Sequence, residues 1–214
     1  MTYELVAADT LNAEQVHDLR AIYEGGYTVA DRAPWRRVYA NRLSTDHALA
    51  LVRGDTAAGF ALLRAPSDAG YALLRYFVID PSQRGHGVGA RFWHLVTAYA
   101  SKHGHRRLIW DVAAPDDPAA ETDERASQRG RIGIHERAGG SLVPIGEYDD
   151  GDTADSPPQA VAMRLVATSL GEGMDTIDAR GLRRIAMDVC AHRYEFAIEA
   201  TRGAVAPIDS GHEP

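Results

Sequence analysis

The chain has 214 residues, of which 45% are hydrophobic and 25% are charged, as in an ordinary globular protein with one sizeable domain and a small addition. With 23 basic against 30 acidic residues, its formal net charge of −7 argues against nucleic acid, a partner that needs a broad basic face. The single cysteine, Cys190, excludes an internal disulfide framework and a cysteine-based zinc site.

The first predicted elements are a strand, a helix and a second, shorter helix. Residues 3–7 alternate loosely and predict a strand. From residue 11, apolar side chains recur on one face of a helix, with Asn12 as its N-cap and Gly25-Gly26 at its end. The second helix is expected near Pro34, because proline is well tolerated in the first turn of a helix.

Strand patterns dominate the next part of the chain. Residues 47–53 and 57–64 are predicted to be strands joined by a hairpin at Gly54-Asp55. After a proline- and glycine-containing turn, residues 71–79 form a further apolar run of strand length. These three strands are expected to pair antiparallel because short connections join them.

The remaining pattern alternates between helix and strand. Apolar residues recur at i, i+4, i+7, i+8 and i+11 from Val88 and predict an amphipathic helix. A buried strand is expected at 108–112, a helix at 123–138, and a closing pair of strands at 142–145 and 159–166. This order of elements indicates a mixed α/β or α+β domain.

A strand, a glycine-rich turn and a helix follow one another between Arg75 and Val96. Glycines at 85, 87 and 89 let backbone N–H groups approach a ligand, and the first amides of a helix attract anions. The arrangement predicts a phosphate site. A P-loop would need Gly-Lys-Ser/Thr, and a Rossmann fingerprint would open the first βαβ unit, so both readings fit poorly. A tight turn without a ligand would not need three alternating glycines.

Two motifs resemble those of the GNAT N-acetyltransferases over residues 3–167. Arg84-x-x-Gly87-x-Gly89 is similar to their acyl-CoA pyrophosphate motif, and RIGIHERAGG at 131–140 resembles their closing helix. The resemblance implies a mixed, mostly antiparallel sheet flanked by helices, with splayed fourth and fifth strands that admit acetyl-CoA. It implies pantetheine pairing with Phe77, Val78 and Ile79, and a pyrophosphate cradle at Arg84, Gly85, His86, Gly87, Val88, Gly89 and Ala90.

The resemblance also assigns roles in acetyl transfer, with two departures. The backbone N–H of Val78 is expected to stabilise the oxyanion. His135 stands where relatives carry the tyrosine that acts as general acid. It is expected either to take over that role or to be an ordinary histidine packed on the side of the helix. Arg75 stands where many relatives carry a glutamate base, and it cannot accept a proton. Asp111 is the alternative base or a site for the cationic amine, and it also fits an ion pair with Arg75.

Four residues are predicted to line the acceptor site: Tyr27, Trp35, Arg75 and Tyr148. Each aromatic one fits ordinary packing as well. His103-Gly-His105 reads as a basic helix end, so no metal is expected. The predicted function is transfer of acetyl from acetyl-CoA to a primary amine of a small molecule by direct attack in a ternary complex. The alternatives are a protein or peptide N-acetyltransferase and a non-catalytic acyl-CoA-binding regulatory module.

The two ends of the chain carry further expectations. The N-terminus lacks a signal-peptide pattern, and no apolar run of 18 residues occurs, so a cytoplasmic protein without a membrane partner is expected. Residues 1–168 are the expected catalytic domain, 169–202 a C-terminal helical extension and 203–214 a disordered tail. The apolar stripe of that helix must be buried on its own domain or on a second subunit, which would make a homodimer.

Overall fold

The computed structural model describes residues 2–27, 32–40, 42–66, 70–85, 87–113, 139–142, 148–149, 162–171, 181, 184–185 and 187–189. The chain splits into two compact units. The first comprises Met1–Trp110, Ile134–Ser141 and Val166–Met174, and the second comprises Asp111–Gly133, Leu142–Leu165 and Asp175–Pro214. The sequence-based domain boundaries at 168 and 202 stay predictions.

The elements, in chain order, are β1 (Glu4–Ala7), η1 (Ala8–Thr10), α1 (Ala13–Gly26), α2 (Trp35–Val38), β2 (Asp46–Arg53), β3 (Thr56–Arg64), β4 (Tyr71–Ile79), η2 (Pro81–Gln83), α3 (Val88–Lys102), β5 (Arg107–Ala113), β6 (Gly140–Leu142), β7 (Tyr148–Asp149) and β8 (Ala162–Ser169). The predicted fourth strand has the same ends as β4, and the other predicted strands up to β5 differ by a residue at one or both ends. The closing strands are shifted. β6 shares only residue 142 with the strand predicted at 142–145, and β8 both begins and ends three residues later than the strand predicted at 159–166. The helix predicted at 123–138 lies outside the described residues.

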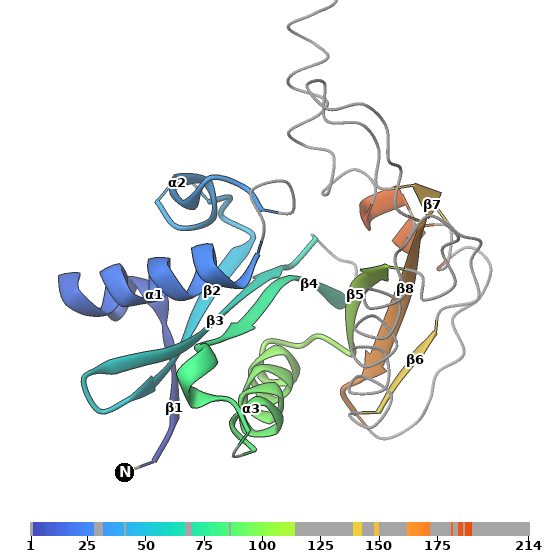
Figure 1. The fold of residues 1–214 in the computed structure, drawn as a ribbon. Helices are drawn as coiled ribbons and strands as arrows, with labels where there is room; N and C mark the ends of the chain where they lie inside the picture. The colour runs from blue at the N-terminus through green and yellow to red at the C-terminus, as the bar shows by residue number, and fades with distance from the viewer. Residues whose placement is uncertain are drawn as a thin grey trace, which may run out of the picture. The chain divides into compact units, whose positions relative to one another are not determined.

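The first unit is built on a mostly antiparallel sheet (Figure 1). The described strands follow the order β1-β2-β3-β4-β5-β8-β6, with β7 paired to β8. Strands β1 to β4 lie wholly in the first unit, whereas β5, β6 and β8 each have residues in both units. Pairs β1–β2, β2–β3 and β3–β4 are antiparallel, whereas β4 and β5 are parallel. The hairpin between β2 and β3 makes that pair antiparallel, and the crossover through α3 makes the β4–β5 pair parallel. The mixed α/β fold class expected from the sequence is confirmed.

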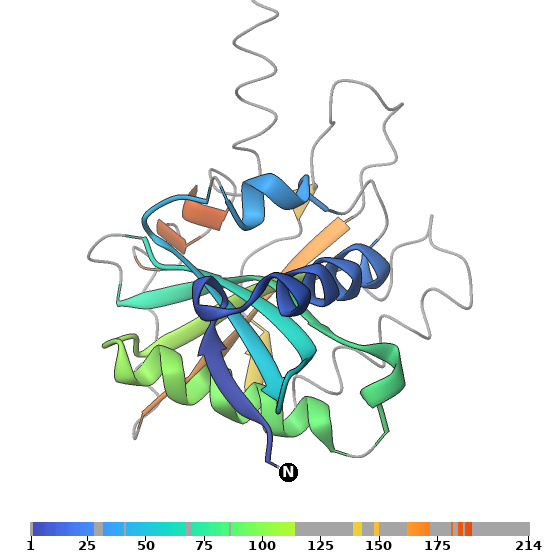
Figure 2. The same cartoon turned by 90° about the vertical axis from the view of Figure 1, so that its left-hand side faces the viewer.

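Helices cover both faces of this sheet. Figure 2 shows α1 over one face and α3 over the other. On α1 the buried side chains are Leu19, Ile22 and Tyr23, and on α3 they are Val88, Phe92, Val96 and Ala100. The apolar stripes seen in the sequence are therefore the surfaces that pack on the sheet.

Local signals set the ends of α1. Asn12 is its N-cap: the Asn12 side chain accepts from the Gln15 N–H at 2.9 Å, and the Gln15 side chain accepts from the Asn12 N–H at 3.1 Å. This reciprocal pair is a capping box, which satisfies two amides at the helix start. The N-cap role expected for Asn12 is confirmed.

A buried ion pair joins the start of β2 to the end of β3. Asp46 and Arg64 face one another in the register. Arg64 donates from Nε to Oδ1 of Asp46 at 2.6 Å and from Nη2 to Oδ2 at 2.9 Å. The side chains are only 7% and 1% exposed, so each charge depends on the other for compensation.

Histidines gather where α3 ends beside β2. His47 Nδ1 lies 2.9 Å from the Tyr99 hydroxyl, and the His103 ring stacks on Tyr99 with centroids 4.0 Å apart. Burial lowers the pKa of His47, and the nearby imidazole of His103 lowers it further. Burial likewise lowers the pKa of His105. Among the described residues, no group of three or more histidine, cysteine or acidic side chains is placed to hold a metal ion.

The second unit is described at fewer positions. In it β7 pairs antiparallel with the first half of β8, with Tyr148 opposite Met163. The expected C-terminal helix is described at 181, 184–185 and 187–189, which are helical, and Ile185 and Val189 are buried there. Residues 203–214 lie outside the described part of the chain. Within the described residues, no helix has both the length and the apolar character needed to cross a membrane.

Candidate functional site

Strands β4 and β5 part soon after they meet. Their register covers three residue pairs and ends with Leu73 opposite Ile109. β4 nevertheless continues to Ile79, paired on its other side with β3 as far as Gly59. Beyond Leu73, therefore, the edge of β4 that faces away from β3 has no ladder pairs with β5 among the described residues. This is the splay that the sequence resemblance implied. We call this part of the strand the open edge.

A β-bulge at Arg75 accounts for the change of direction. The β3–β4 register shifts there: Leu63 faces Leu74 and Leu62 faces Tyr76, so Arg75 is the extra residue. A bulge bends its strand and increases the local twist. It lies two residues after the last β4–β5 pair, where β4 must turn away from its parallel neighbour.

Backbone alternation decides which groups of β4 face the open edge. The Asp80 N–H donates to the Ala58 carbonyl at 3.0 Å, and Phe60 pairs with Val78 two residues further along the ladder. Because hydrogen-bonding direction alternates along a strand, Val78 directs its N–H and C=O towards β3. Phe77 and Ile79 direct theirs to the opposite side, the open edge.

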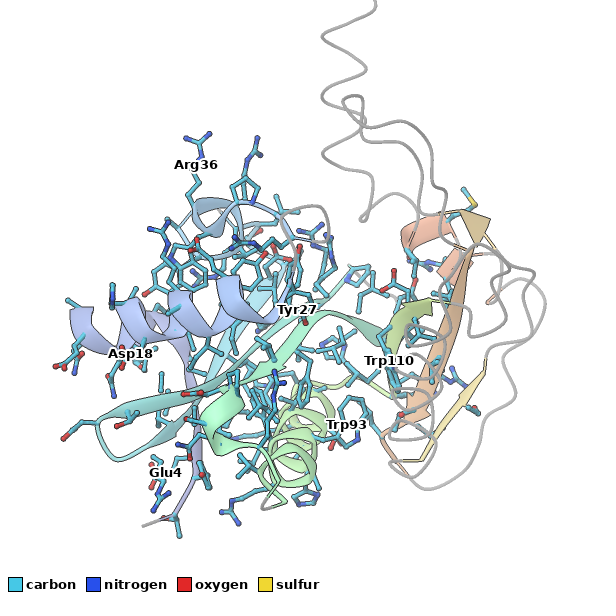
Figure 3. All side chains as sticks on the ribbon, viewed as in Figure 1. Glu4, Asp18, Tyr27, Arg36, Trp93 and Trp110 are labelled. Atoms are coloured by element: carbon cyan, nitrogen blue, oxygen red, sulfur yellow. The ribbon has the colours of Figure 1, made fainter. Side chains whose placement is uncertain are left out.

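Tyr27 contacts that edge from the end of α1, where Figure 3 labels it. Its hydroxyl accepts from the Phe77 N–H at 2.7 Å and donates to the Phe77 carbonyl at 3.0 Å. Close packing brings it there, since a Cβ on the neighbouring Gly26 would lie 2.2 Å from Cγ2 of Val78. Tyr27, expected in the acceptor site, thus lies on the strand edge expected to hold the donor.

The glycine turn follows β4 directly. Asp80 caps the short helix η2 by accepting from the Ser82 N–H at 2.8 Å. Gly85 and Gly87 have φ of 92° and 73°, a left-handed conformation that favours glycine, and Gly87 is the N-cap of α3. A Cβ on Gly89 would lie 3.2 Å from Cδ1 of Ile79, so this glycine lets α3 start close to β4.

This turn presents hydrogen-bond donors at its surface. The first amides of α3, from Val88 to Ala90, precede the first possible intrahelical bond, and Arg91 N–H donates to the Gly87 carbonyl at 3.0 Å as that bond. The exposed Arg84 guanidinium reaches back to the Ile79 carbonyl at 3.4 Å. The turn can therefore bind an anion through backbone amides, the helix dipole and a cationic side chain. His86 lies outside the described residues.

Aromatic side chains line the α3 face of the same strand. Phe77 stacks on Phe92 with centroids 4.6 Å apart, and its ring meets the edge of Trp93 at 5.8 Å. Trp93 in turn packs edge-to-face on Trp110 of β5 at 5.0 Å, and Figure 3 labels both tryptophans. Trp93 thus spans β4 and β5 close to where they separate. Neither tryptophan was predicted from the sequence as a site residue, because only its aromatic character pointed to such a role.

A second aromatic cluster lies on the α1 face around Tyr23. Its ring is within 6 Å of Tyr27, Trp35, Phe60 and Tyr76, with centroid separations from 5.0 to 5.9 Å. Burial, and then the neighbouring Tyr76 hydroxyl, raise the pKa of the Tyr23 phenol, so it stays neutral. The cluster brings together Tyr27 and Trp35, two of the four predicted acceptor residues.

The other predicted residues are less closely connected. Arg75 is the half-buried bulge residue of β4, and Asp111 is half-buried where β5 enters the second unit. Both take part in polar or electrostatic interactions. The backbone of Tyr148 lies in β7. His135 lies outside the described residues, so its proposed acid role stays a prediction.

Comparisons with known proteins agree with this geometry. Residues 16–125, about half of the chain, match the Acetyltransferase (GNAT) family. None of the curated proteins compared with the chain matches it. A Bacteroides thetaiotaomicron protein assigned to the GNAT acetyltransferases is similar in fold, with a TM-score of 0.66 and 14% identity over 89% of this chain and 97% of its own.

Two further structures share the fold. The ribosomal-protein-S18-alanine N-acetyltransferase of Escherichia coli has a TM-score of 0.55 and 17% identity, covering 82% of this chain and 100% of its own. A GNAT acetyltransferase from Elizabethkingia anophelis, solved with acetyl-CoA bound, has a TM-score of 0.52 and 13% identity, covering 78% and 97%. The parted strands, the glycine turn and the family match over half its length together show that this chain belongs to the GNAT acetyltransferase family.

Proposed function

We propose that the protein transfers an acetyl group from acetyl-CoA to a primary amine of a small molecule, with both substrates bound together. The observation that supports this most is the continuity of two features. The open edge of β4 at Phe77 and Ile79 leads, through η2, directly into the glycine turn. A strand edge suits the amides of pantetheine, and the turn suits the pyrophosphate that follows them in CoA.

The residues present fit such a donor. Pantetheine amides would pair with the open-edge groups of Phe77 and Ile79, as an added strand would. The pyrophosphate would bind the turn amides beside Arg84. At Gly85 and Gly87 no atom of the described residues lies within 4 Å of where a Cβ would be, so this part of the turn leaves space for a ligand. Acetyl-CoA would supply a thioester whose carbonyl carbon is open to attack by an amine.

Stabilising the oxyanion requires a donor aimed at the acetyl oxygen. The sequence resemblance suggested the Val78 N–H, but the β3 ladder engages that amide. We therefore assign the role to the Phe77 N–H, which faces the open edge and already makes a hydrogen bond at 2.7 Å. With this assignment, the reacting carbonyl would lie at the open edge of β4, four residues beyond the last β4–β5 pair.

For the acceptor site we propose residues that were predicted from the sequence. Trp35, half-buried in the Tyr23 cluster, supplies an apolar wall near the end of α1. Asp111 is proposed to attract the amine or accept its proton, and His135 to protonate the departing thiolate. Arg75 and Tyr148 complete the proposed acceptor set. A compact acceptor is favoured because this wall consists of large, mutually packed rings.

Calorimetric titration with acetyl-CoA tests the donor assignment. Saturable binding below about 1 mM is expected, the upper end of usual Michaelis constants. No heat of binding at that concentration would exclude the proposed donor. Thiol release from acetyl-CoA would then be followed with matched panels of small amines and short peptides. Turnover only with peptides would favour a protein acceptor, and binding without turnover on either panel would favour a non-catalytic module.

A further inference from the structure

The one backbone position proposed to hold the acetyl oxygen is already occupied by a side chain. The Tyr27 hydroxyl accepts from the Phe77 N–H and donates to the Phe77 carbonyl, at 2.7 and 3.0 Å. These are the two bonds that a neighbouring strand would make with an edge residue. We propose that Tyr27 is a displaceable stand-in for the acyl donor, covering Phe77 while the site is empty and releasing it when acetyl-CoA binds.

The Tyr27 hydroxyl and the acetyl oxygen compete for one hydrogen-bond donor, the Phe77 N–H. An acetyl oxygen bound to the Phe77 N–H would lie about 2.9 Å from the nitrogen, along the N–H direction. The Tyr27 oxygen lies at 2.7 Å from the same nitrogen. An amide has one proton and makes one well-aligned hydrogen bond, so the phenol must move aside for the acyl oxygen to bind in full.

The position of Tyr27 allows such a movement. It is the C-cap of α1, with an extended backbone at φ −136° and ψ 146°, and its side chain is half-buried. Its ring touches Tyr23 and Tyr76 at 5.9 and 5.2 Å in tilted and edge-to-face contacts. A side-chain rotation would release the hydroxyl while Gly26 stays packed on Val78.

A second side chain covers the next open-edge residue. Arg84 donates to the Ile79 carbonyl at 3.4 Å, a long contact from an exposed guanidinium. Phe77 and Ile79 are thus both engaged by side chains from outside the sheet. Covering an unpaired edge also prevents it from pairing with another strand. The shorter and more buried contact of Tyr27 makes it the stronger competitor of the two.

The proposal predicts an unusual result for a conservative substitution. Tyr27→Phe keeps the ring but removes the hydroxyl. In the empty protein the Phe77 N–H therefore loses its hydrogen bond to Tyr27. In the complex the bond from the Phe77 N–H to the acetyl oxygen is unchanged. Acetyl-CoA should therefore bind about tenfold tighter, the equivalent of one net hydrogen bond. Free CoA lacks the acetyl oxygen and should gain distinctly less. Tyr39→Phe is the matched control, because the Tyr39 hydroxyl donates to the Ala8 carbonyl at 3.1 Å, away from β4.

Titration calorimetry of the full-length protein and both variants with acetyl-CoA and CoA gives the comparison. Amide hydrogen exchange at Phe77, followed by NMR, gives an independent one: exchange should speed up in Tyr27→Phe and slow again with acetyl-CoA. In the unsubstituted protein, the Tyr27 ring resonances should shift on adding acetyl-CoA, which tests displacement even if the variant does not fold.

The outcomes separate this inference from the proposed function on which it rests. Acetyl-CoA binding that is unchanged or weaker in Tyr27→Phe, or an equal gain for both ligands, would overturn the stand-in role and leave the donor assignment intact. Unchanged exchange at Phe77 in the empty variant would do the same. Failure of the unsubstituted protein to bind acetyl-CoA would instead remove the donor assignment and the stand-in role together.

Discussion

Replacing Gly26 by alanine tests how closely α1 packs on β4. The added Cβ would lie 2.2 Å from Cγ2 of Val78, whereas ordinary contacts begin at 3.4 Å, so helix and strand must separate by about 3.4 − 2.2 = 1.2 Å or distort. Val78 is only 5% exposed and β-branched, so its side chain has little freedom to turn away. The clash should lower the free energy of unfolding by about 1–3 kcal/mol.

Helix propensity works in the opposite direction and has to be separated. Alanine is favoured over glycine in a helix by up to about 1 kcal/mol. Gly25→Ala measures this gain alone, because no atom in the described part of the chain lies within 4 Å of a Cβ at that position. Val78→Ala removes the methyl group that the new Cβ would meet, leaving the Val78 Cβ at 3.1 Å. In the double variant most of the clash cost should therefore be recovered.

The double-mutant cycle compares the unsubstituted protein, Gly26→Ala, Val78→Ala and the double variant. Urea unfolding of each is followed by circular dichroism. The helix term and the cost of truncating Val78 cancel in the coupling free energy, which should be about 1–3 kcal/mol in favour of the double variant. Equal m-values would confirm that the same surface is exposed on unfolding. A coupling below about 0.5 kcal/mol, with Gly26→Ala as stable as Gly25→Ala, would refute the close packing of Gly26 on Val78.

Three further predictions follow from other contacts. Arg84→Glu should weaken acetyl-CoA binding about tenfold through repulsion at the pyrophosphate, while the exposed Arg36→Glu on α2 should leave it unchanged; equal calorimetric effects would contradict the assignment. Asp46→Asn should lower the free energy of unfolding by about 3–5 kcal/mol because Arg64 keeps a buried charge; a loss below about 1 kcal/mol in urea would be inconsistent with that. His47 has a pKa lowered by burial, so the unfolded chain takes up its proton first and stability should fall as the pH drops below about 6.5. His47→Gln should flatten that slope, and an unchanged slope in urea melts would count against the buried ring.

The sequence predicted the features that local chemistry determines. Asn12 as a cap, the hairpin at Gly54-Asp55 and the strand 71–79 all depend on residues close together in the chain, and all are confirmed. The glycine turn was predicted for the same reason. Gly85 and Gly87 adopt left-handed conformations that other residues rarely tolerate.

Contacts between distant residues could not be read from the sequence. Tyr27 and Phe77 are 50 positions apart, and nothing local to either indicates that a phenol meets a strand edge. The choice between Val78 and its neighbours for the oxyanion also depended on the ladder with β3, because adjacent residues of a strand point their amides in opposite directions. Trp93 was not predicted as a site residue, because its neighbour Phe92 is the one that fits the apolar stripe of the helix.

The bulge at Arg75 bears on which changes of length the protein can accept. Leu73 and Tyr76 lie on one face of β4, and Leu74 and Phe77 on the other, because the extra residue resets the alternation. Deleting that extra residue would leave both halves of the strand with the same faces and the same partners on β3, but it would remove the bend that turns β4 away from β5. Insertions and deletions between relatives should therefore collect at the tip of the Gly54-Asp55 hairpin, while β4 keeps its length residue for residue.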